Sequence, residues 1–182
     1  MNQFQYGFKL PVSHTQIIAM GSPQRGDIAL FRGPKHPDII FVKRVIGLPG
    51  DHVRYHNHIL SINGHQAQLK HCHPAIFKDP ELGDIPVSKC LETLPGGIQH
   101  SIYENRSKKI QTDGAWVIPK HQYFMMGDNR DNSNDSRYWG TVPVKNFIGP
   151  ARWVWMSFDR IALREHRWSN VIRWHHIGAR IR

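Results

Sequence analysis

The chain has 182 residues, 40% of them hydrophobic, and its 24 lysines and arginines exceed its 14 aspartates and glutamates to give a formal net charge of +10. This length suits one domain with an ample core, and the charge suits contact with an anionic membrane surface or nucleic acid without indicating a fold. No run of 18 apolar residues occurs and Met1 is not followed by an apolar signal segment, so the sequence predicts no transmembrane helix and no signal peptide.

Short strands dominate the first third of the chain. Residues 17–20 and 28–31 are apolar runs of strand length, and the second follows the polar turn Arg25-Gly26-Asp27. Two prolines then mark a connection into a longer strand at residues 39–46. After this strand, Leu48-Pro49-Gly50-Asp51 suits a type II turn, because proline presets the first central residue and glycine accepts a positive φ at the second.

The strand at residues 39–46 is apolar except for Lys43-Arg44. Alternation places Lys43 on one face between Phe41 and Val45. Burial there would lower the pKa of the lysine amine, since it disfavours the charged form. A lysine that is neutral near pH 7 can act as a general base, which an arginine cannot. The alternative is a lysine on an edge strand that extends into water.

Residues 52–69 indicate a hairpin, with Asn63-Gly64 between alternating residues as its turn. Histidine and cysteine side chains gather in and just after this hairpin: His52, His56, His58, His65, His71, Cys72 and His73. Their spacing matches no closed Cys/His zinc pattern, so we expect neither a metal ion nor another cofactor.

Residues 70–114 are rich in proline, glycine and charge and show no clear periodicity, so we interpret them as an excursion from the main sheet. Cys72 and Cys90 are the two cysteines of the chain. A disulfide in an oxidising compartment and two free thiols are both compatible with the sequence. Sequence alone does not establish that the two Cα atoms come within bonding range.

Strands are also predicted at residues 114–118, 123–126 and 147–158. Four of the six tryptophans lie in the last part of the chain beside many arginines: Trp153, Trp155, Trp168 and Trp174. Tryptophan and arginine together suit the headgroup layer of a membrane. Core aromatics with solvated arginines are an equal alternative.

The segment 125–140, MMGDNRDNSNDSRYWG, is the most distinctive stretch of the chain. Asp, Asn and Ser bond to nearby backbone and favour tight turns over the interiors of helices and strands. Their density directly after an apolar strand predicts a rigid, internally bonded loop, which is where functional sites tend to lie. A solvated surface loop is the alternative.

Two of these segments resemble the longest signature boxes of bacterial type I signal peptidase (leader peptidase). Residues 43–51 (KRVIGLPGD) resemble one box, residues 127–137 (GDNRDNSNDSR) resemble the other, and Arg25-Gly26-Asp27-Ile28 resembles a shorter third box. Order and spacing are also similar. The likeness continues through residues 116–119 and 155–158 and covers nearly the whole chain, although weakly in the middle.

The resemblance implies a serine endopeptidase with a Ser–Lys dyad that removes signal peptides from exported preproteins. Lys43 would be the general base, and Ser133 would hydrogen-bond its amine and orient it. Asp135 and Arg137 would form a structural ion pair that supports the loop. No cofactor takes part in this chemistry.

Strand signals with few helix caps predict a mainly β fold. The resemblance adds antiparallel β-sheets with a barrel-like catalytic core. It further implies a single catalytic domain over residues 1–182, with a β-rich insertion at roughly residues 70–114.

The nucleophile is the main departure from the family pattern. In this family it lies in a Ser-x-Met-x-Pro box, after one or more membrane-spanning helices and before the Arg-Gly-Asp box. No such box occurs here: Ser22 lies three residues before Arg25 with Met and Pro in the wrong order, and Ser13 lacks the motif too. We therefore interpret the chain as N-terminally truncated, with its nucleophile unknown, and expect it to be inactive as given.

By resemblance, the protein belongs at the bacterial inner membrane with its catalytic domain on the periplasmic side. Its expected partners are preprotein signal peptides and the membrane surface. The alternative is a catalytically inactive signal-peptidase-like fragment or paralogue that binds preproteins or the membrane surface. Nucleic acid is not expected as a partner, because charge is its only support and no RNA-binding or helix-turn-helix pattern occurs.

Overall fold

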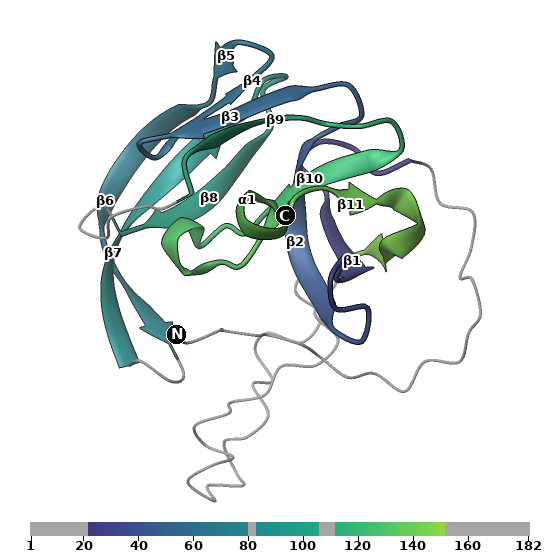
Figure 1. Cartoon of the computed structure of the whole chain (residues 1–182). Helices are drawn as coiled ribbons and strands as arrows, with labels where there is room; N and C mark the ends of the chain where they lie inside the picture. Colours follow the sequence, from purple (N-terminus) through teal and green to yellow (C-terminus); the bar gives the residue numbers. More distant parts are fainter. Residues whose placement is uncertain (1–21, 80–82, 106–111, 152–182) are drawn as a thin grey trace, which may run out of the picture.

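A computed structural model describes residues 22–79, 83–105 and 112–151 (Figure 1). Within these residues the chain forms three antiparallel sheets with strand orders β11-β10-β2-β1-β12, β5-β4-β3-β9 and β6-β7-β8. Helical structure there is limited to short turns: η1 (Arg130–Asn132), α1 (Ser136–Trp139) and η2 (Val144–Asn146). The mainly β, antiparallel fold class predicted from the sequence is confirmed.

The five-stranded sheet consists of β1 (Ile28–Arg32), β2 (Ile40–Gly47), β10 (Gln122–Met126), β11 (Val142–Pro143) and β12 (Phe147–Pro150). The central strand β2 pairs with β1 on one side and β10 on the other. The predicted strands at residues 28–31, 39–46 and 123–126 are therefore confirmed. Several further predictions concern residues outside the described ranges: the strand at 17–20, residues 152–158 and the four tryptophans Trp153, Trp155, Trp168 and Trp174.

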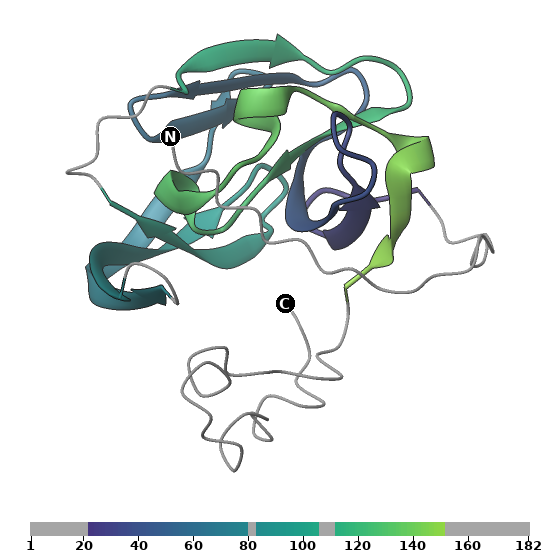
Figure 2. The same ribbon diagram turned by 60° about the horizontal axis from the view of Figure 1, so that its bottom comes forward.

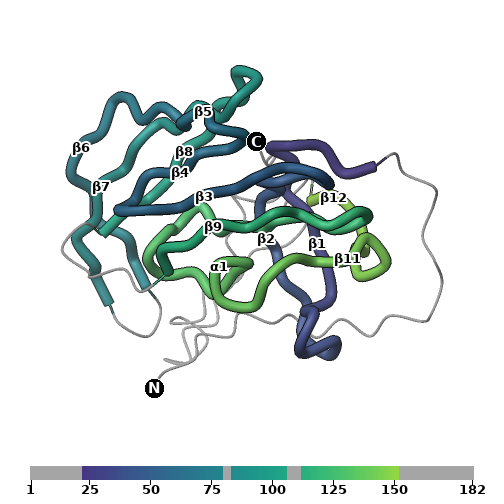
Figure 3. The backbone as a smooth tube through the Cα atoms, turned by 45° about the horizontal axis from the view of Figure 1, so that its top comes forward, coloured from purple at the N-terminus to yellow at the C-terminus, as the bar shows by residue number. Residues whose placement is uncertain are grey.

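The four-stranded sheet consists of β3 (His52–His56), β4 (Ile59–Ile62), β5 (His65–Gln66) and β9 (Gly114–Val117), and β3 and β9 run side by side in Figure 3. The turn from β2 into this sheet has Gly50 at φ 89° and a hydrogen bond from the Asp51 N–H to the Leu48 carbonyl at 3.0 Å, as the sequence predicts. The predicted Asn63-Gly64 turn is also present, with φ values of 52° and 80°.

The three-stranded sheet consists of β6 (Gln68–Asp79), β7 (Gly83–Thr93) and β8 (Gln99–Glu104). Most residues of β6 are exposed on both faces, so the strand lacks the apolar alternation by which a sequence reveals a strand. Cys72 of β6 and Cys90 of β7 form a disulfide, which decides between the two alternatives left by the sequence. That the stretch at roughly 70–114 is an insertion in a single domain stays a prediction.

Two hydrophobic clusters share the strand pair β2–β10 as a common wall. Ile46, Phe124 and Met126 point into the first cluster, together with residues of β3 and β4. Their immediate neighbours Val45 and Met125 point into the second, with residues of β1. Alternation along each strand produces this division, because successive side chains leave opposite faces of a sheet.

The polar loop that follows β10 lies between the five-stranded and three-stranded sheets (Figures 1 and 2). An isolated bridge from Tyr103 at the end of β8 to Asn129 ties the loop to the three-stranded sheet. In the part of the chain that the structure describes, no helix has the length and apolar character needed to cross a membrane.

Candidate active site

Lys43 lies on β2 opposite Ala29 of β1 and is half-buried. Its Nζ atom is 2.7 Å from the Oγ atom of Ser133, 90 residues further along the chain. The two residues that the sequence analysis placed in the site are thus in hydrogen-bonding contact. The alternative of an edge-strand lysine is wrong, since β2 has a neighbour on each side.

The loop holds Ser133 by closing on itself. The Asp135 carboxylate accepts hydrogen bonds from the backbone N–H of Gly127 at 3.0 Å and of Arg137 at 3.2 Å. The Ser136 hydroxyl accepts one from the Met125 N–H at 2.9 Å. These short polar side chains satisfy backbone N–H groups near the end of β10, in the loop and in the short helix α1, so the loop is held in one conformation.

Gly127 allows the loop to pass close to Lys43. A Cβ atom at this position would lie 2.1 Å from Ser133 Oγ and 3.3 Å from Lys43 Nζ. Even a methyl group would therefore collide with the hydroxyl that holds the amine. A glycine is needed here for space.

Burial lowers the pKa of the Lys43 amine below its ordinary value. The Asp135 carboxylate raises it, and Arg137 and Asp128 contribute in opposite senses, but together they do not restore the ordinary value. The amine consequently loses its proton at a lower pH than an exposed lysine does. A neutral amine held by a hydroxyl in a fixed direction can accept a proton from a second hydroxyl group.

Asp135 and Arg137 are ion-paired, with Oδ1 and Nε 2.9 Å apart. Both side chains are buried. Burial would raise the pKa of Asp135, but the Arg137 guanidinium and the hydrogen bonds from Arg137 and Gly127 keep the carboxyl pKa below its usual range. The Arg137 Nη2 atom also donates a hydrogen bond to the Arg130 carbonyl. The ion pair therefore connects the parts of the loop before and after Ser133.

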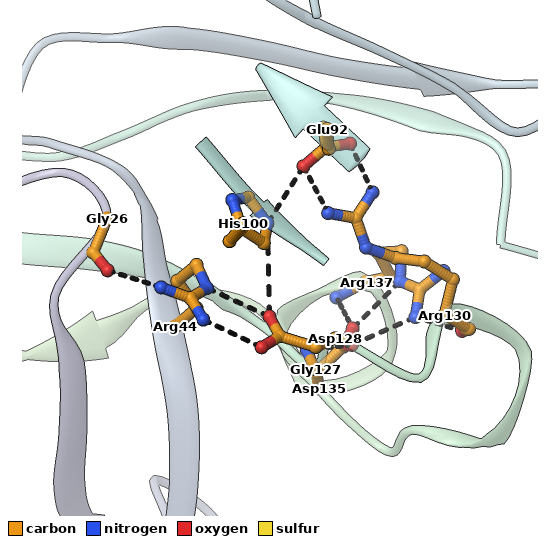
Figure 4. A network of polar contacts seen from close by, with 9 residues as sticks. All are labelled: Gly26, Arg44, Glu92, His100, Gly127, Asp128, Arg130, Asp135 and Arg137. Carbon is orange, nitrogen blue, oxygen red and sulfur yellow. Dashed lines mark hydrogen bonds and ion pairs between the residues drawn. The ribbon is translucent and has the colours of Figure 1, made fainter. Parts of the chain in front are cut away.

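A second ion pair joins the loop to the strand of the lysine. The Asp128 carboxylate accepts two hydrogen bonds from the buried Arg44 guanidinium, at 2.9 and 2.8 Å (Figure 4). The third nitrogen of Arg44 donates to the Gly26 carbonyl at 2.7 Å, within the predicted Arg-Gly-Asp turn. The three segments singled out from the sequence therefore meet at Arg44.

The sequence analysis missed two residues of this network, Glu92 of β7 and His100 of β8. They lie directly opposite each other in the three-stranded sheet, and both are buried. Figure 4 shows them between Arg130 and Asp128. The turn signal Leu94-Pro95-Gly96-Gly97 could have identified this hairpin and placed the two residues face to face.

Within the described ranges, the histidines, cysteines and carboxylates form no group of three or more that could hold a metal ion. The histidines of the hairpin lie in β3, in β5 and, for His58, in the turn between β3 and β4, and the two that follow lie in β6.

A model of the family described as "Signal peptidase, peptidase S26" matches residues 1–156 of the chain. Signal peptidase I of Pseudomonas aeruginosa is 41% identical over 191 residues, which cover 98% of this chain and 63% of that protein. Signal peptidase I of Pseudomonas fluorescens is 41% identical over 170 residues, covering 87% and 58%. The enzyme of that name from Buchnera aphidicola subsp. Acyrthosiphon pisum is 36% identical over 215 residues, covering 98% and 68%.

The chain thus spans less than two thirds of the length of the two Pseudomonas proteins. Among solved structures, a signal peptidase I from Enterococcus faecalis V583 is similar with a TM-score of 0.44 and 25% sequence identity, covering 73% of this chain and 99% of that one.

Proposed function

Because the chain belongs to the signal peptidase family, peptidase S26, we propose that it removes signal peptides from exported preproteins as a serine endopeptidase. The observation that carries this proposal is the contact of 2.7 Å between Lys43 Nζ and Ser133 Oγ at an amine whose pKa is lowered. A peptidase that relies on lysine needs this combination, since only the uncharged amine accepts a proton.

In this mechanism Lys43 takes the proton of a serine hydroxyl as that oxygen attacks the scissile carbonyl. The lysine then gives the proton to the leaving amine, and it serves as base again when water hydrolyses the acyl-enzyme ester. Ser133 holds the amine, and the Asp135–Arg137 pair holds the loop of Ser133. The attacking serine is not assigned to a residue of this chain.

We further propose that the activity takes place at the bacterial inner membrane, with the domain on its periplasmic side. Signal peptides are apolar segments that lie in the membrane, so their cleavage sites emerge at its surface. The Cys72–Cys90 disulfide supports the periplasmic side, because disulfides persist in oxidising compartments. The net charge of +10 suits an anionic lipid surface.

The test is preprotein cleavage by the protein expressed from its complete open reading frame. Lys43→Ala is expected to lower kcat on the order of a thousandfold, since a general base contributes about that much. Ser133→Ala should lower kcat by up to about 100-fold through misplacement of the amine. The matched control is Lys145→Ala, which removes an exposed lysine of η2 and should leave kcat unchanged.

Cleavage that survives Lys43→Ala would disprove the assigned base. Binding of preproteins with no product, and no difference between Lys43→Ala and Lys145→Ala, would overturn the proposed function.

A further inference from the structure

We infer that Glu92 and His100 are positioning residues for the Lys43–Ser133 pair, acting from the three-stranded sheet through Arg130 and Asp128. The inference rests on the proposed function for its catalytic meaning. Neither residue touches the amine. Their effect comes from holding the loop at residues 127–137, which carries Ser133.

The first connection is the ion pair of Glu92 with Arg130. The two guanidinium nitrogens Nη1 and Nη2 each donate to one carboxylate oxygen, at 2.8 and 2.5 Å. Both side chains are almost completely buried, with exposures of 1% and 2%. Such a fork fixes the direction of the arginine as well as its distance, unlike a single hydrogen bond.

Arg130 transmits this constraint to the site. It lies in η1, three residues before Ser133, and its carbonyl accepts a hydrogen bond from Arg137. Arg137 in turn pairs with Asp135, two residues after Ser133. Ser133 therefore lies between two fixed positions of the loop, Arg130 and Asp135. The first of them is held by the Glu92 carboxylate of the three-stranded sheet.

His100 makes the second connection. Its Nε2 atom lies 3.1 Å from Glu92 Oε2 and 3.9 Å from Asp128 Oδ1 (Figure 4). Asp128 pairs with Arg44, the neighbour of Lys43 on β2. The imidazole thus spans from the Glu92–Arg130 pair to the Asp128–Arg44 pair and lies fully inside the protein.

Other contacts run in parallel with these two. The Tyr103 N–H donates to the Asp128 carbonyl at 2.8 Å, and the Asn105 N–H donates to the Asp131 carboxylate at 2.6 Å. Both donors belong to β8 or directly follow it. The three-stranded sheet consequently supports the loop over most of its length. Its buried charged and titratable groups at this contact include Glu92, His100 and Asp79, whose carboxylate accepts a hydrogen bond from the Asn132 side chain at 3.0 Å.

Stability alone does not account for a buried ion pair. Replacing such a pair with apolar residues of similar volume is often neutral or stabilising, whereas removing one partner is strongly destabilising. A pair that serves only stability could therefore be exchanged for apolar residues without loss of function. A pair that sets the direction of Arg130 could not.

The experiment compares three variants of the full-length protein. Glu92→Gln breaks the pair, and the double variant Glu92→Leu with Arg130→Met replaces it with apolar residues so that the fold is kept. Asp113→Asn is the control, because it breaks the His56–Asp113 pair of 2.7 Å, which lies outside the loop and outside the segments that resemble signature boxes. The readouts are kcat and KM for preprotein cleavage, and the titration of Lys43 by NMR with ¹³Cε-labelled lysine.

In Glu92→Gln and in the double variant we expect kcat to fall by roughly 100-fold, the loss that a displacement of about 1 Å produces. KM should change less than about twofold. The pKa of Lys43 should move up toward its ordinary value, because a loosened loop admits water to the amine. Asp113→Asn should leave both readouts unchanged.

His100 is tested by conservative rescue. His100→Gln keeps a nitrogen donor near the position of Nε2 and should retain most of kcat, whereas His100→Leu removes the 3.1 Å contact with Glu92 and should lose about tenfold, the size of one polar contact with a charged group. Equal kcat values for the two variants would show that His100 is not a positioning residue.

A double variant with normal kcat and a normal Lys43 titration would overturn the role of Glu92. If Glu92→Gln does not fold, the double variant decides alone. The titration also separates this inference from the proposed function. If the natural protein cleaves no preprotein, the proposed function fails, yet an unchanged or shifted Lys43 titration still decides whether Glu92 positions the loop.

Discussion

At Lys43 the demands of chemistry and of stability oppose each other. Burial lowers the pKa of the amine, which a general base requires, and the same burial disfavours the ammonium form in the folded state. We expect Lys43→Met to fold more stably than the natural chain at neutral pH while lacking activity. An apolar side chain of similar length loses the hydrogen bond to Ser133 but avoids the burial of a charge.

The difference in stability between Lys43→Met and the natural chain should depend on pH in a definite direction. Between the lowered pKa of folded Lys43 and the ordinary value of 10.5, the unfolded chain binds more protons than the folded chain. The stability of the natural chain should therefore rise with pH across this window. The advantage of Lys43→Met should be largest below the window and shrink as pH 10.5 is approached, as measured by thermal unfolding at several pH values. Lys145→Met, at an exposed lysine, should show no such trend.

Gly127 sets the space available to the hydroxyl and the amine. A Cβ atom 2.1 Å from Ser133 Oγ must displace either the loop or the serine. Gly127→Ala should cost about 1–3 kcal/mol by overpacking and lower kcat by roughly 100-fold through misplacement of the site. Chemical denaturation and preprotein cleavage measure the two effects.

Gly149→Ala is the matched control, since a Cβ atom there meets nothing within 4 Å. Its stability should stay within about 0.5 kcal/mol of the natural chain. Equal behaviour of the two alanine variants would contradict the close approach at Gly127.

At the residue level, the sequence could nominate Lys43 because a lysine inside an apolar strand is chemically unusual. The role of Ser133 was predicted only from the resemblance, because the sequence does not distinguish one serine in a polar loop from its neighbours. Glu92 and His100 escaped because nothing in a sequence shows that a charged side chain on a polar strand turns inward. Their burial depends on the loop that covers them.

Among the elements, the pair β6–β7 depends most on a covalent bond. β6 is largely exposed, and few of its side chains reach either hydrophobic cluster. The disulfide between Cys72 and Cys90 closes a loop of sequence separation 18, for which loop-closure entropy gives about 3 kcal/mol. Reduction should lower the Tm by roughly 5–10 °C for a chain of this size.

The double variant Cys72→Ser with Cys90→Ser should melt at the temperature of the reduced natural chain, as followed by circular dichroism. A Tm that does not respond to a reductant would contradict a stabilising role of the bond.

Element prediction succeeded where local chemistry decides the structure. The apolar runs of β1, β2 and β10 and the turns at Gly50 and Asn63-Gly64 were recognisable because each has a distinct composition. The turn at Asn57-His58, with positive φ values of 48° and 63°, lacks the glycine of the Asn-Gly pair that marks a two-residue hairpin turn most clearly.

For the whole molecule, the shared wall of β2 and β10 predicts where unfolding is hardest. Opening either strand exposes residues of both hydrophobic clusters, so their amides should exchange only through global unfolding. The short edge strand β5, whose two residues are exposed, should exchange far earlier. Native-state hydrogen exchange measures both, and amides of β2 that exchange as fast as those of β5 would contradict a common wall.

The order of the three sheets could not be predicted from patterns along the chain. Side-chain hydrogen bonds at the site join residues 84 to 90 positions apart, Arg44 with Asp128 and Lys43 with Ser133, and no local signal fixes such contacts. The expectation that Lys43 and Ser133 lie in contact came from the resemblance. The support of the loop by the three-stranded sheet is visible only in the folded structure.

The backbone of Gly127 also decides how a foreign molecule can reach Lys43. This glycine and Ser133 lie against the amine, so an electrophile cannot approach from their side. Lysines in water carry a proton near neutral pH and react slowly with aldehydes and activated esters, whereas an uncharged amine is a nucleophile. A covalent inhibitor directed at this lysine would therefore gain selectivity over exposed lysines from the lowered pKa of its amine.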